Sequence, residues 1–316
     1  MKIPVYIVTG FLGSGKTTVL KKMLRSLKEQ GKRPALIMNE LGSENVEKEM
    51  FEDEAMIELL NGCICCTIQE DMRNELQLFL SQTTNVDVII IEGTGIANPA
   101  EIVEALTHPE LIDLVKIVSI IGMVDASRYL EYQSLFQSSK EIRTMLKQQI
   151  ESSALLIMNK MDLIDQKKEK KVRAKIEEIK RREVPIVYST YGDVSEETLL
   201  ETRFLTDVIS TEKSTHHHHH DHHHHTFQAI KIEGINSFTQ KDFEKWLKSH
   251  GPTLLRAKGY ITFLGEDKVN SFQYAANRLE IESIDIPKQT CIILIGTNLN
   301  KDVLDQSLSE FVQQNI

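Results

Sequence analysis

The chain contains 316 residues, with a hydrophobic fraction of 41% and a formal net charge of −9. The length exceeds that of one typical domain, and no run approaches the roughly eighteen apolar residues of a membrane span, so we expect two domains and no membrane contact. The negative charge argues against a nucleic-acid partner, which would require a basic stripe facing the phosphates.

The chain begins Met1-Lys2-Ile3-Pro4 and enters an apolar run at once, so we expect no cleavable signal peptide. Three of the four cysteines stand at positions 63, 65 and 66, a grouping more typical of a metal or redox site than of a disulfide framework. The fourth, Cys291, has apolar neighbours and is expected to be a buried structural thiol. We therefore expect a cytoplasmic protein.

Short runs rich in valine and isoleucine recur along the first 205 residues, with amphipathic segments between them. The runs cover residues 3–8, 35–38, 86–91, 117–124 and 155–158, and the segments cover residues 17–30, 71–80 and 167–182. This alternation predicts an α/β fold with a mostly parallel, doubly wound sheet.

The composition then changes at a segment that contains nine histidines between positions 216 and 225, interrupted only by Asp221. Such low complexity is typical of a linker. Beyond it, a strand at 227–232 and a helix at 239–249 predict a smaller α+β domain. The expected parts are therefore a nucleotide-binding domain at 1–205, a His-rich linker at 206–226 and a C-terminal domain at 227–316.

Residues 10–17 read Gly-Phe-Leu-Gly-Ser-Gly-Lys-Thr, directly after the first run and at the start of the first amphipathic segment. This is the Walker A pattern in its strand-loop-helix context, and its full spacing argues against a glycine-rich turn without a ligand. Glycines let the backbone wrap around phosphate oxygens with its N–H groups pointing inward. The nucleotide-binding residues expected here are Gly10, Gly13, Ser14, Gly15, Lys16, Thr17 and Thr18.

The side chains at the end of this loop have separate expected roles. Lys16 neutralises the β- and γ-phosphates, and Thr17 supplies a hydroxyl ligand to Mg²⁺, which prefers oxygen ligands shared with phosphates and water. Thr18 is expected beside the α-phosphate.

Asn159-Lys160-Met161-Asp162 follows another apolar run and matches the N-K-x-D pattern that reads guanine. The Asp162 carboxylate can accept hydrogen bonds from guanine N1–H and the 2-amino group, whereas adenine has no matching pair of donors. Ordinary polar residues capping a strand are the alternative. Downstream of a Walker A loop, we favour guanine and predict that Asn159, Lys160 and Asp162 bind GTP.

Two further polar segments follow predicted strands. Glu92 ends the run at 86–91 in the manner of a Walker B acid, where it would orient the Mg²⁺ shell or the attacking water, and Gly95 is placed to offer an N–H to the γ-phosphate. Glu40 follows the second run, where a nucleotide-sensing loop usually lies; a polar exit from a strand is the alternative. We assign Lys16, Glu40 and Glu92 to catalysis.

The cysteine element reads Gly62-Cys63-Ile64-Cys65-Cys66. In an extended chain Cys63 and Cys65 face the same side, while Cys66 points elsewhere unless the loop curls. A structural zinc site normally has four ligands, so this one is incomplete, and Glu40, Glu44 or a water could complete it. An incomplete site suits a carrier, and a ligand from the sensing loop would couple metal affinity to the nucleotide. Structural cysteines or a redox switch are the alternatives.

The histidine run also indicates metal, because neutral imidazoles bind Zn²⁺, Ni²⁺, Cu²⁺ and Co²⁺ at cytosolic pH. The general affinity order does not choose among these ions. An engineered tag is the alternative, but the internal position and Asp221 favour a native metal-sequestering linker. His108 and His250 are isolated and expected at turns.

With these motifs assembled, the chain resembles the CobW-like GTPases, a metal-handling branch of the P-loop GTPases related to urease and hydrogenase maturation factors. The second domain resembles that family's C-terminal domain through residues 256–259 and 295–299, and a His-rich junction is similarly common. The marks of the resemblance in the first domain are residues 10–18, Asn39-Glu40, residues 62–66, Glu92-Gly93-Thr94-Gly95 and residues 159–162.

The resemblance implies slow GTP hydrolysis and a transition metal, zinc first, bound by Cys63, Cys65 and Cys66 with Glu40. The metal would be delivered to a client metalloprotein or a cofactor-pathway enzyme, and the implied cofactors are GTP, Mg²⁺ and Zn²⁺ or Co²⁺. Two departures matter. Ser43 precedes Glu44, which weakens Glu44 as a ligand, and Gly93-Thr94 replaces the more usual Thr-Thr after the Walker B acid.

Three rival functions remain open at this point. One is cobalt delivery for cobalamin synthesis or activation of a metalloenzyme, and another is a His-rich metal buffer with little nucleotide coupling. The third is a P-loop small-molecule kinase, against which the guanine-reading pattern counts. The sequence leaves a homodimer open, and the second domain is our candidate for client recognition.

Overall fold

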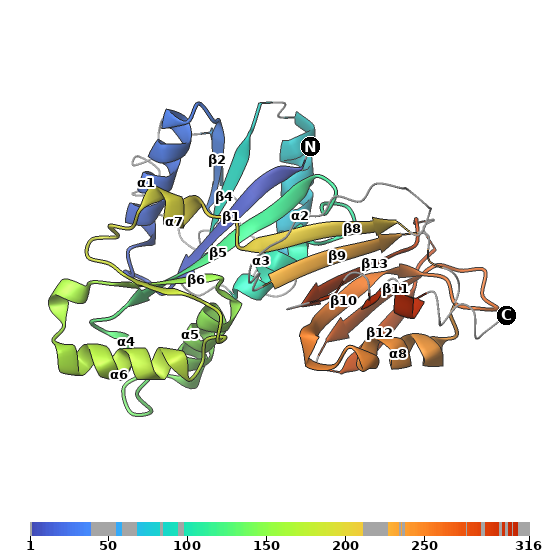
Figure 1. Cartoon of the computed structure of the whole chain (residues 1–316). Helices are drawn as coiled ribbons and strands as arrows, with labels where there is room; N and C mark the ends of the chain where they lie inside the picture. The colour runs from blue at the N-terminus through green and yellow to red at the C-terminus, as the bar shows by residue number, and fades with distance from the viewer. Residues whose placement is uncertain are drawn as a thin grey trace. The chain divides into compact units, whose positions relative to one another are not determined.

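The computed structural model describes most of the chain, in two compact units (Figure 1). The first unit is Met1–Leu106 with Asp113–Arg203, and the second is Thr107–Ile112 with Phe204–Ile316. The described residues are 2–38, 55–58, 68–82, 85–93, 98–210, 227–233, 235, 238–275, 277–285, 288–296, 299–300, 303–304 and 306–308.

The first unit is built on a seven-stranded sheet in the order β3-β2-β4-β1-β5-β6-β7, with every described pair parallel. Strands β2 to β4 lie on one side of β1 and β5 to β7 on the other, so the carboxyl end of β1 is at the switch point where such sheets bind ligands. The strands are β1 (Ile3–Gly10), β2 (Pro34–Met38), β3 (Ala55–Glu58), β4 (Val88–Glu92), β5 (Val115–Asp125), β6 (Leu155–Asn159) and β7 (Ile186–Tyr188).

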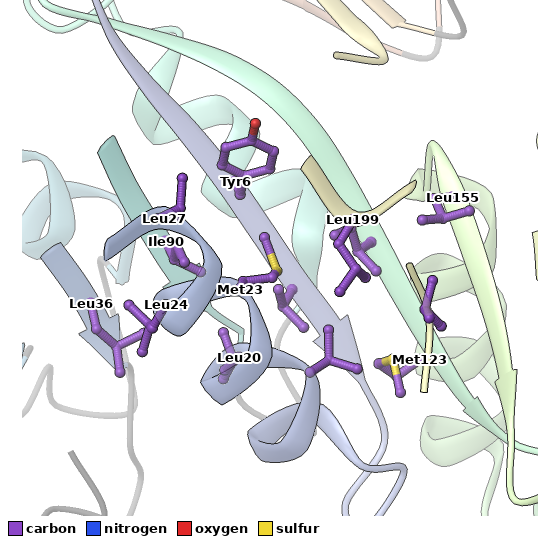
Figure 2. Close-up of a cluster of buried hydrophobic side chains, with 14 of the residues drawn as sticks. Tyr6, Leu20, Met23, Leu24, Leu27, Leu36, Ile90, Met123, Leu155 and Leu199 are labelled. Atoms are coloured by element: carbon purple, nitrogen blue, oxygen red, sulfur yellow. The ribbon is translucent and has the colours of Figure 1, made fainter. Parts of the chain in front are cut away.

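Helices cover both faces of this sheet because alternate strand residues point to opposite sides. On one face, the apolar stripe of α1 packs in a cluster with Tyr6, Leu36 and Ile90 (Figure 2). Leu155 and Ile157 of β6 belong to the same cluster. On the other face, Leu156 and Met158 pack with α5 and α6. The helices are α1 (Lys16–Glu29), α2 (Ile68–Gln82), α3 (Pro99–Leu106), α4 (Tyr129–Tyr132), α5 (Lys140–Ser152), α6 (Gln166–Glu177) and α7 (Glu196–Leu200).

The predicted α/β class is confirmed, with differences at the ends of elements. The helix expected at 167–182 ends at Glu177, because the N–H groups of Ile179 and Lys180 both bond to the Ile176 carbonyl and close the last turn. Strand β7 was not predicted, since three residues are too few to show a periodic pattern.

The second unit contains a six-stranded sheet in the order β12-β11-β10-β13-β9-β8, antiparallel except for the β8–β9 pair. Helix α8 (Gln240–Ser249), capped by the Thr239 side chain, contributes Phe243 and Trp246 to an aromatic core with Phe238, Phe263 and Phe272. The strands are β8 (Phe204–Ser210), β9 (Phe227–Glu233), β10 (Leu254–Ile261), β11 (Asn270–Ala275), β12 (Arg278–Ser283) and β13 (Cys291–Gly296).

The junction between the units differs from the expected linker at 206–226. Residues 206–210 form the end of β8, whose parallel register with β9 pairs Ser210 with Glu233, so the strand belongs to the second sheet. The second unit also takes residues 107–112 from within the expected first domain. The histidine run lies outside the described residues.

Among the described residues, no helix has both the length and the apolar character needed to cross a membrane.

Candidate functional site

The phosphate loop connects β1 to α1, as the sequence predicts, and its backbone requires glycine at two points. Gly10 has a φ of +144°, and a Cβ there would overlap with the Met123 carbonyl oxygen of the neighbouring strand β5. Gly15 has a φ of +102°, and a Cβ there would overlap with the Asn159 side-chain amide. The loop therefore approaches two neighbouring strands too closely for any side chain at these positions.

Lys16 and Glu92 meet beside this loop because β1 and β4 are paired, with Val8 opposite Glu92. Lys16 Nζ lies 3.6 Å from Glu92 Oε1, and the two side chains are 8% and 10% exposed. Removing two charges from water is costly, so a buried pair is weak evidence for a stabilising role and fits a site built for a charged ligand. The predicted catalytic pair Lys16 and Glu92 is thus brought together.

Three hydroxyl groups come from residues in or next to the phosphate loop. The hydroxyls of Thr9 and Ser14 are fully buried and have no hydrogen-bond partner within the described part of the chain. Thr17, half-buried in the first turn of α1, adds a third hydroxyl. Buried polar groups normally have partners, and a set of oxygen donors beside a phosphate loop fits Mg²⁺ together with phosphate.

Asn159, the last residue of β6, joins the phosphate loop to a second loop. Its Nδ2 donates to the Ser14 carbonyl at 2.9 Å, and its Oδ1 accepts from the Gly192 N–H at 2.9 Å. The side chain is buried, and these two bonds use both ends of its amide. The Asn159 side chain therefore joins the phosphate loop to the loop that contains Gly192.

Lys160 and Asp162 follow Asn159 on the surface. Lys160 has a φ of +62°, and its Nζ lies 2.6 Å from Oδ2 of the buried Asp125, which also accepts from the Ser127 N–H at 2.9 Å. Asp162 lies exposed in a short 3₁₀ helix, Met161–Leu163, so its carboxylate is accessible to a ligand. The predicted base-reading residues share one edge of the sheet.

Sequence reasoning missed two parts of this edge, Asp125 and residues 189–192. Asp125 ends β5 as Glu92 ends β4, so the same rule about acids at strand ends would have found it. Residues 189–192 follow β7, and Gly192 lies against Thr18, since a Cβ at Gly192 would be 3.2 Å from Thr18 Cγ2. The chain reverses direction at Tyr191 and Gly192, which both have positive φ. In the sequence, Gly192 was the only sign of this turn.

Several predicted ligands lie outside the described residues, namely Glu40, Cys63, Cys65, Cys66 and Gly95. Within the described ranges, no group of three or more His, Cys, Asp or Glu side chains could hold a metal ion. The expected cysteine site therefore stays a prediction. Cys291 is a buried thiol, as expected, and His250 caps the end of α8.

The phosphate loop, the Lys16–Glu92 pair and the N-K-x-D segment lie at the carboxyl ends of strands β1, β4 and β6 of one parallel sheet, which defines a P-loop nucleotide-binding protein of the GTPase class. The particular family follows from two matches. Residues 4–187 match "CobW/HypB/UreG, nucleotide-binding domain", and residues 227–312 match "Cobalamin synthesis protein cobW C-terminal domain". The chain belongs to the CobW/HypB/UreG family, which confirms the expected resemblance.

The relatives differ in how much of their own length aligns with this chain. The zinc chaperone CobW of a Sinorhizobium species is 31% identical over 68% of this chain and 67% of its own. The zinc-regulated GTPase metalloprotein activator 1 of Dictyostelium discoideum is 31% identical over 89% of this chain and 64% of its own. The zinc chaperone YjiA of Escherichia coli is 27% identical over 95% of this chain and 96% of its own. This chain therefore spans about two thirds of the first two relatives.

Proposed function

We propose that this protein hydrolyses GTP and uses the nucleotide cycle to carry a transition metal, zinc first, to a client metalloprotein or cofactor-pathway enzyme in the cytoplasm. The observation that carries the nucleotide part is the Asn159 side chain, which joins the phosphate loop to residues 189–192, a segment that we call the base-reading loop. The names of the relatives, zinc chaperone and zinc-regulated GTPase metalloprotein activator, support the metal part.

In this proposal the phosphate loop holds the triphosphate through backbone N–H groups and Lys16. The Lys16 ammonium, which lies 3.6 Å from Glu92, would form an ion pair with the β- and γ-phosphates. Glu92 would orient the attacking water or the water shell of the metal, and Thr17 would hold Mg²⁺. The bound Mg²⁺ supplies charge neutralisation at the phosphate oxygens.

The base would be recognised at the second half of the site. Asp162 accepts from the two guanine donors, and Lys160 is held over this edge by its ion pair with Asp125. Residues 189–192 supply backbone groups beside Thr18. Adenine offers no matching pair of donors to the Asp162 carboxylate, so a site that relies on these hydrogen bonds prefers GTP to ATP.

The cargo would bind at Cys63, Cys65 and Cys66, with Glu40 as the ligand that responds to nucleotide. Two sequence positions support this coupling, because Glu40 follows β2 by two residues and Cys66 precedes α2 by two. A ligand that moves with the γ-phosphate would change zinc affinity by the differential contacts of the two states. Nucleic acid and membrane have no part in this cycle, and a homodimer is left open.

The test is a Zn²⁺ titration against a competing chelator, with residues 216–225 deleted, comparing GDP with a non-hydrolysable GTP analogue in Mg²⁺. We expect zinc affinity at one site to differ by tenfold or more between nucleotides, about 1.4 kcal/mol of coupling. Cys65→Ala should abolish that site. Cys291→Ala is the matched control, because that thiol is buried in β13 and should not bind zinc.

An affinity that ignores the nucleotide would exclude gated zinc delivery, and the titration would then be repeated with Co²⁺. Several ions per full-length chain without any nucleotide dependence would instead support the metal buffer.

A further inference from the structure

Helix α1 is tied to the segment that follows the base-reading loop by two polar contacts. Ser26 Oγ donates to Glu196 Oε2 at 2.6 Å, and Lys22 Nζ lies 2.8 Å from Asp193 Oδ1. We call these four residues the α1–α7 clasp. Ser26 is 1% exposed, whereas the Asp193 side chain is 84% exposed, so the Ser26–Glu196 bond should contribute more than the solvent-screened ion pair.

Apolar contacts support the clasp. Val194 and Leu199 belong to the buried cluster of α1, and Figure 2 shows Leu199 on the same side of the sheet as Leu20 and Met23. At the other end of α7, the Tyr6 hydroxyl donates to the Leu200 carbonyl at 2.7 Å. The segment is thus fastened to β1, which enters the phosphate loop, and to α1, which leaves it.

The loop that this segment holds has an unfavourable backbone. Tyr191 and Gly192 have φ values of +54° and +69°, and a tyrosine rarely adopts this left-handed conformation. The Gly192 N–H must nevertheless meet Asn159 Oδ1 at 2.9 Å. Such a conformation persists only where its surroundings impose it, and two residues of the clasp, Asp193 and Glu196, follow it in the chain.

The clasp itself does not reach the nucleotide site. Ser26 is ten residues along α1 from Lys16, which at the rise of a helix is about 15 Å. An effect of Ser26 on base recognition would therefore be transmitted by its bond to Glu196 and by the loop at 189–192.

We propose that Ser26 and Glu196, with Lys22 and Asp193 beside them, are positioning residues for base recognition. They fix the base-reading loop to the helix that begins at the phosphate loop, and so set the spacing between the two halves of the site. Guanine affinity then depends on the clasp, whereas phosphate affinity does not. This inference rests on the proposed guanine-nucleotide function.

The test compares GDP with inorganic pyrophosphate, both with Mg²⁺, by calorimetry on the full chain. Pyrophosphate can occupy the phosphate loop but has no base. For the double variant Ser26→Ala/Glu196→Ala, we expect GDP to bind about tenfold more weakly, ~1.4 kcal/mol, and pyrophosphate to change less than about twofold. Glu196→Gln should restore most GDP affinity, because its amide oxygen still accepts from Ser26.

Arg25→Ala is the matched control, since Arg25 is the neighbour of Ser26 on α1, has an exposed side chain and lies 3.9 Å from Glu29 of the same helix. Its GDP and pyrophosphate affinities should equal those of the wild type. Equal weakening of GDP and pyrophosphate in the double variant, or no change in either, would overturn the positioning role while GDP preference stands. If the wild-type chain binds pyrophosphate but shows no preference for GDP over ADP, the proposed function itself is overturned.

Discussion

The two units hold their polar side chains in different places. In the first unit the described strands are parallel, so their carboxyl ends share one edge, and Lys16, Glu92 and Asn159 meet there although they are far apart in the sequence. In the second unit all neighbouring strands from β9 to β13 are antiparallel, so successive strand ends alternate between edges. Its described core is aromatic, with the Phe243 and Phe272 ring centroids 4.8 Å apart.

This difference predicts which substitutions should change nucleotide binding and which should change folding. A parallel sheet separates packing from chemistry, because its strands form the core and its loops carry the ligand contacts. In the second unit the described aromatic side chains serve packing directly. Changes in the loops of the first unit should therefore alter nucleotide binding more than folding, and changes in the aromatic core should do the reverse.

The largest expected effect is at Lys16. Lys16→Met keeps the length of the side chain and removes the charge that faces the phosphates, so we expect GTP hydrolysis to fall by about 10³-fold, measured as phosphate release. Circular dichroism should be unchanged, because α1 packs through its apolar stripe. Lys147→Met, on the exposed face of α5, is the control with normal activity. Activity retained in Lys16→Met would show that the loop is not the catalytic site.

A smaller effect separates two glycines of the same loop. Gly15→Ala and Gly13→Ala share the strain of a positive φ, about 1–2 kcal/mol, but only a Cβ at Gly15 overlaps with the Asn159 amide, whereas a Cβ at Gly13 meets nothing within 4 Å. We therefore expect Gly15→Ala to weaken GDP binding at least about tenfold more than Gly13→Ala in a calorimetric titration. Equal losses would mean that backbone strain alone decides the effect, and that the Asn159 contact is unimportant.

The phosphate loop could be predicted because its information is local. Eight consecutive residues between a strand and a helix state the motif, and the structure places Gly10 and Gly15 where only glycine fits. The base-reading half is distributed, with Asn159, Asp125 and residues 189–192 coming from three strands. The N-K-x-D pattern revealed Asn159, and the rule about acids at strand ends would have revealed Asp125. Residues 189–192 depend on strand order, which no single segment contains.

The second unit was predicted in outline and missed at its border. The strand at 227–232 and the helix at 239–249 were found from their patterns, and Thr239 caps the helix as its sequence suggests. Strand β8 was assigned partly to the linker, because it is short and is followed by a polar, low-complexity segment. Its alternation of apolar and polar residues is too brief to mark where the strand ends. Its place in the sheet is set by pairing with β9, which is a tertiary contact.

The smallest expected effect is a pH dependence in the second unit. His250 lies against Trp246, with ring centroids 4.9 Å apart, and burial lowers its pKa below the ordinary value of 6.5. Below pH 6.5 the unfolded chain therefore binds a proton at His250 more readily than the folded chain does. The contribution of His250 to stability falls as the pH falls below 6.5 and is constant above it, with a limiting slope of about 1.4 kcal/mol per pH unit.

Trp246, the single tryptophan, reports unfolding in urea by its fluorescence. His250→Phe keeps an aromatic ring against Trp246 and removes the titrating group, so the difference in unfolding free energy between wild type and variant should change between pH 6.5 and 5.5 but stay constant between pH 7 and 8. GDP affinity should be the same in both proteins, because this side chain packs against Trp246 in the second unit. A variant with the pH dependence of the wild type would assign that dependence to other groups, and a loss of GDP binding would contradict the division between loops that bind and a core that packs.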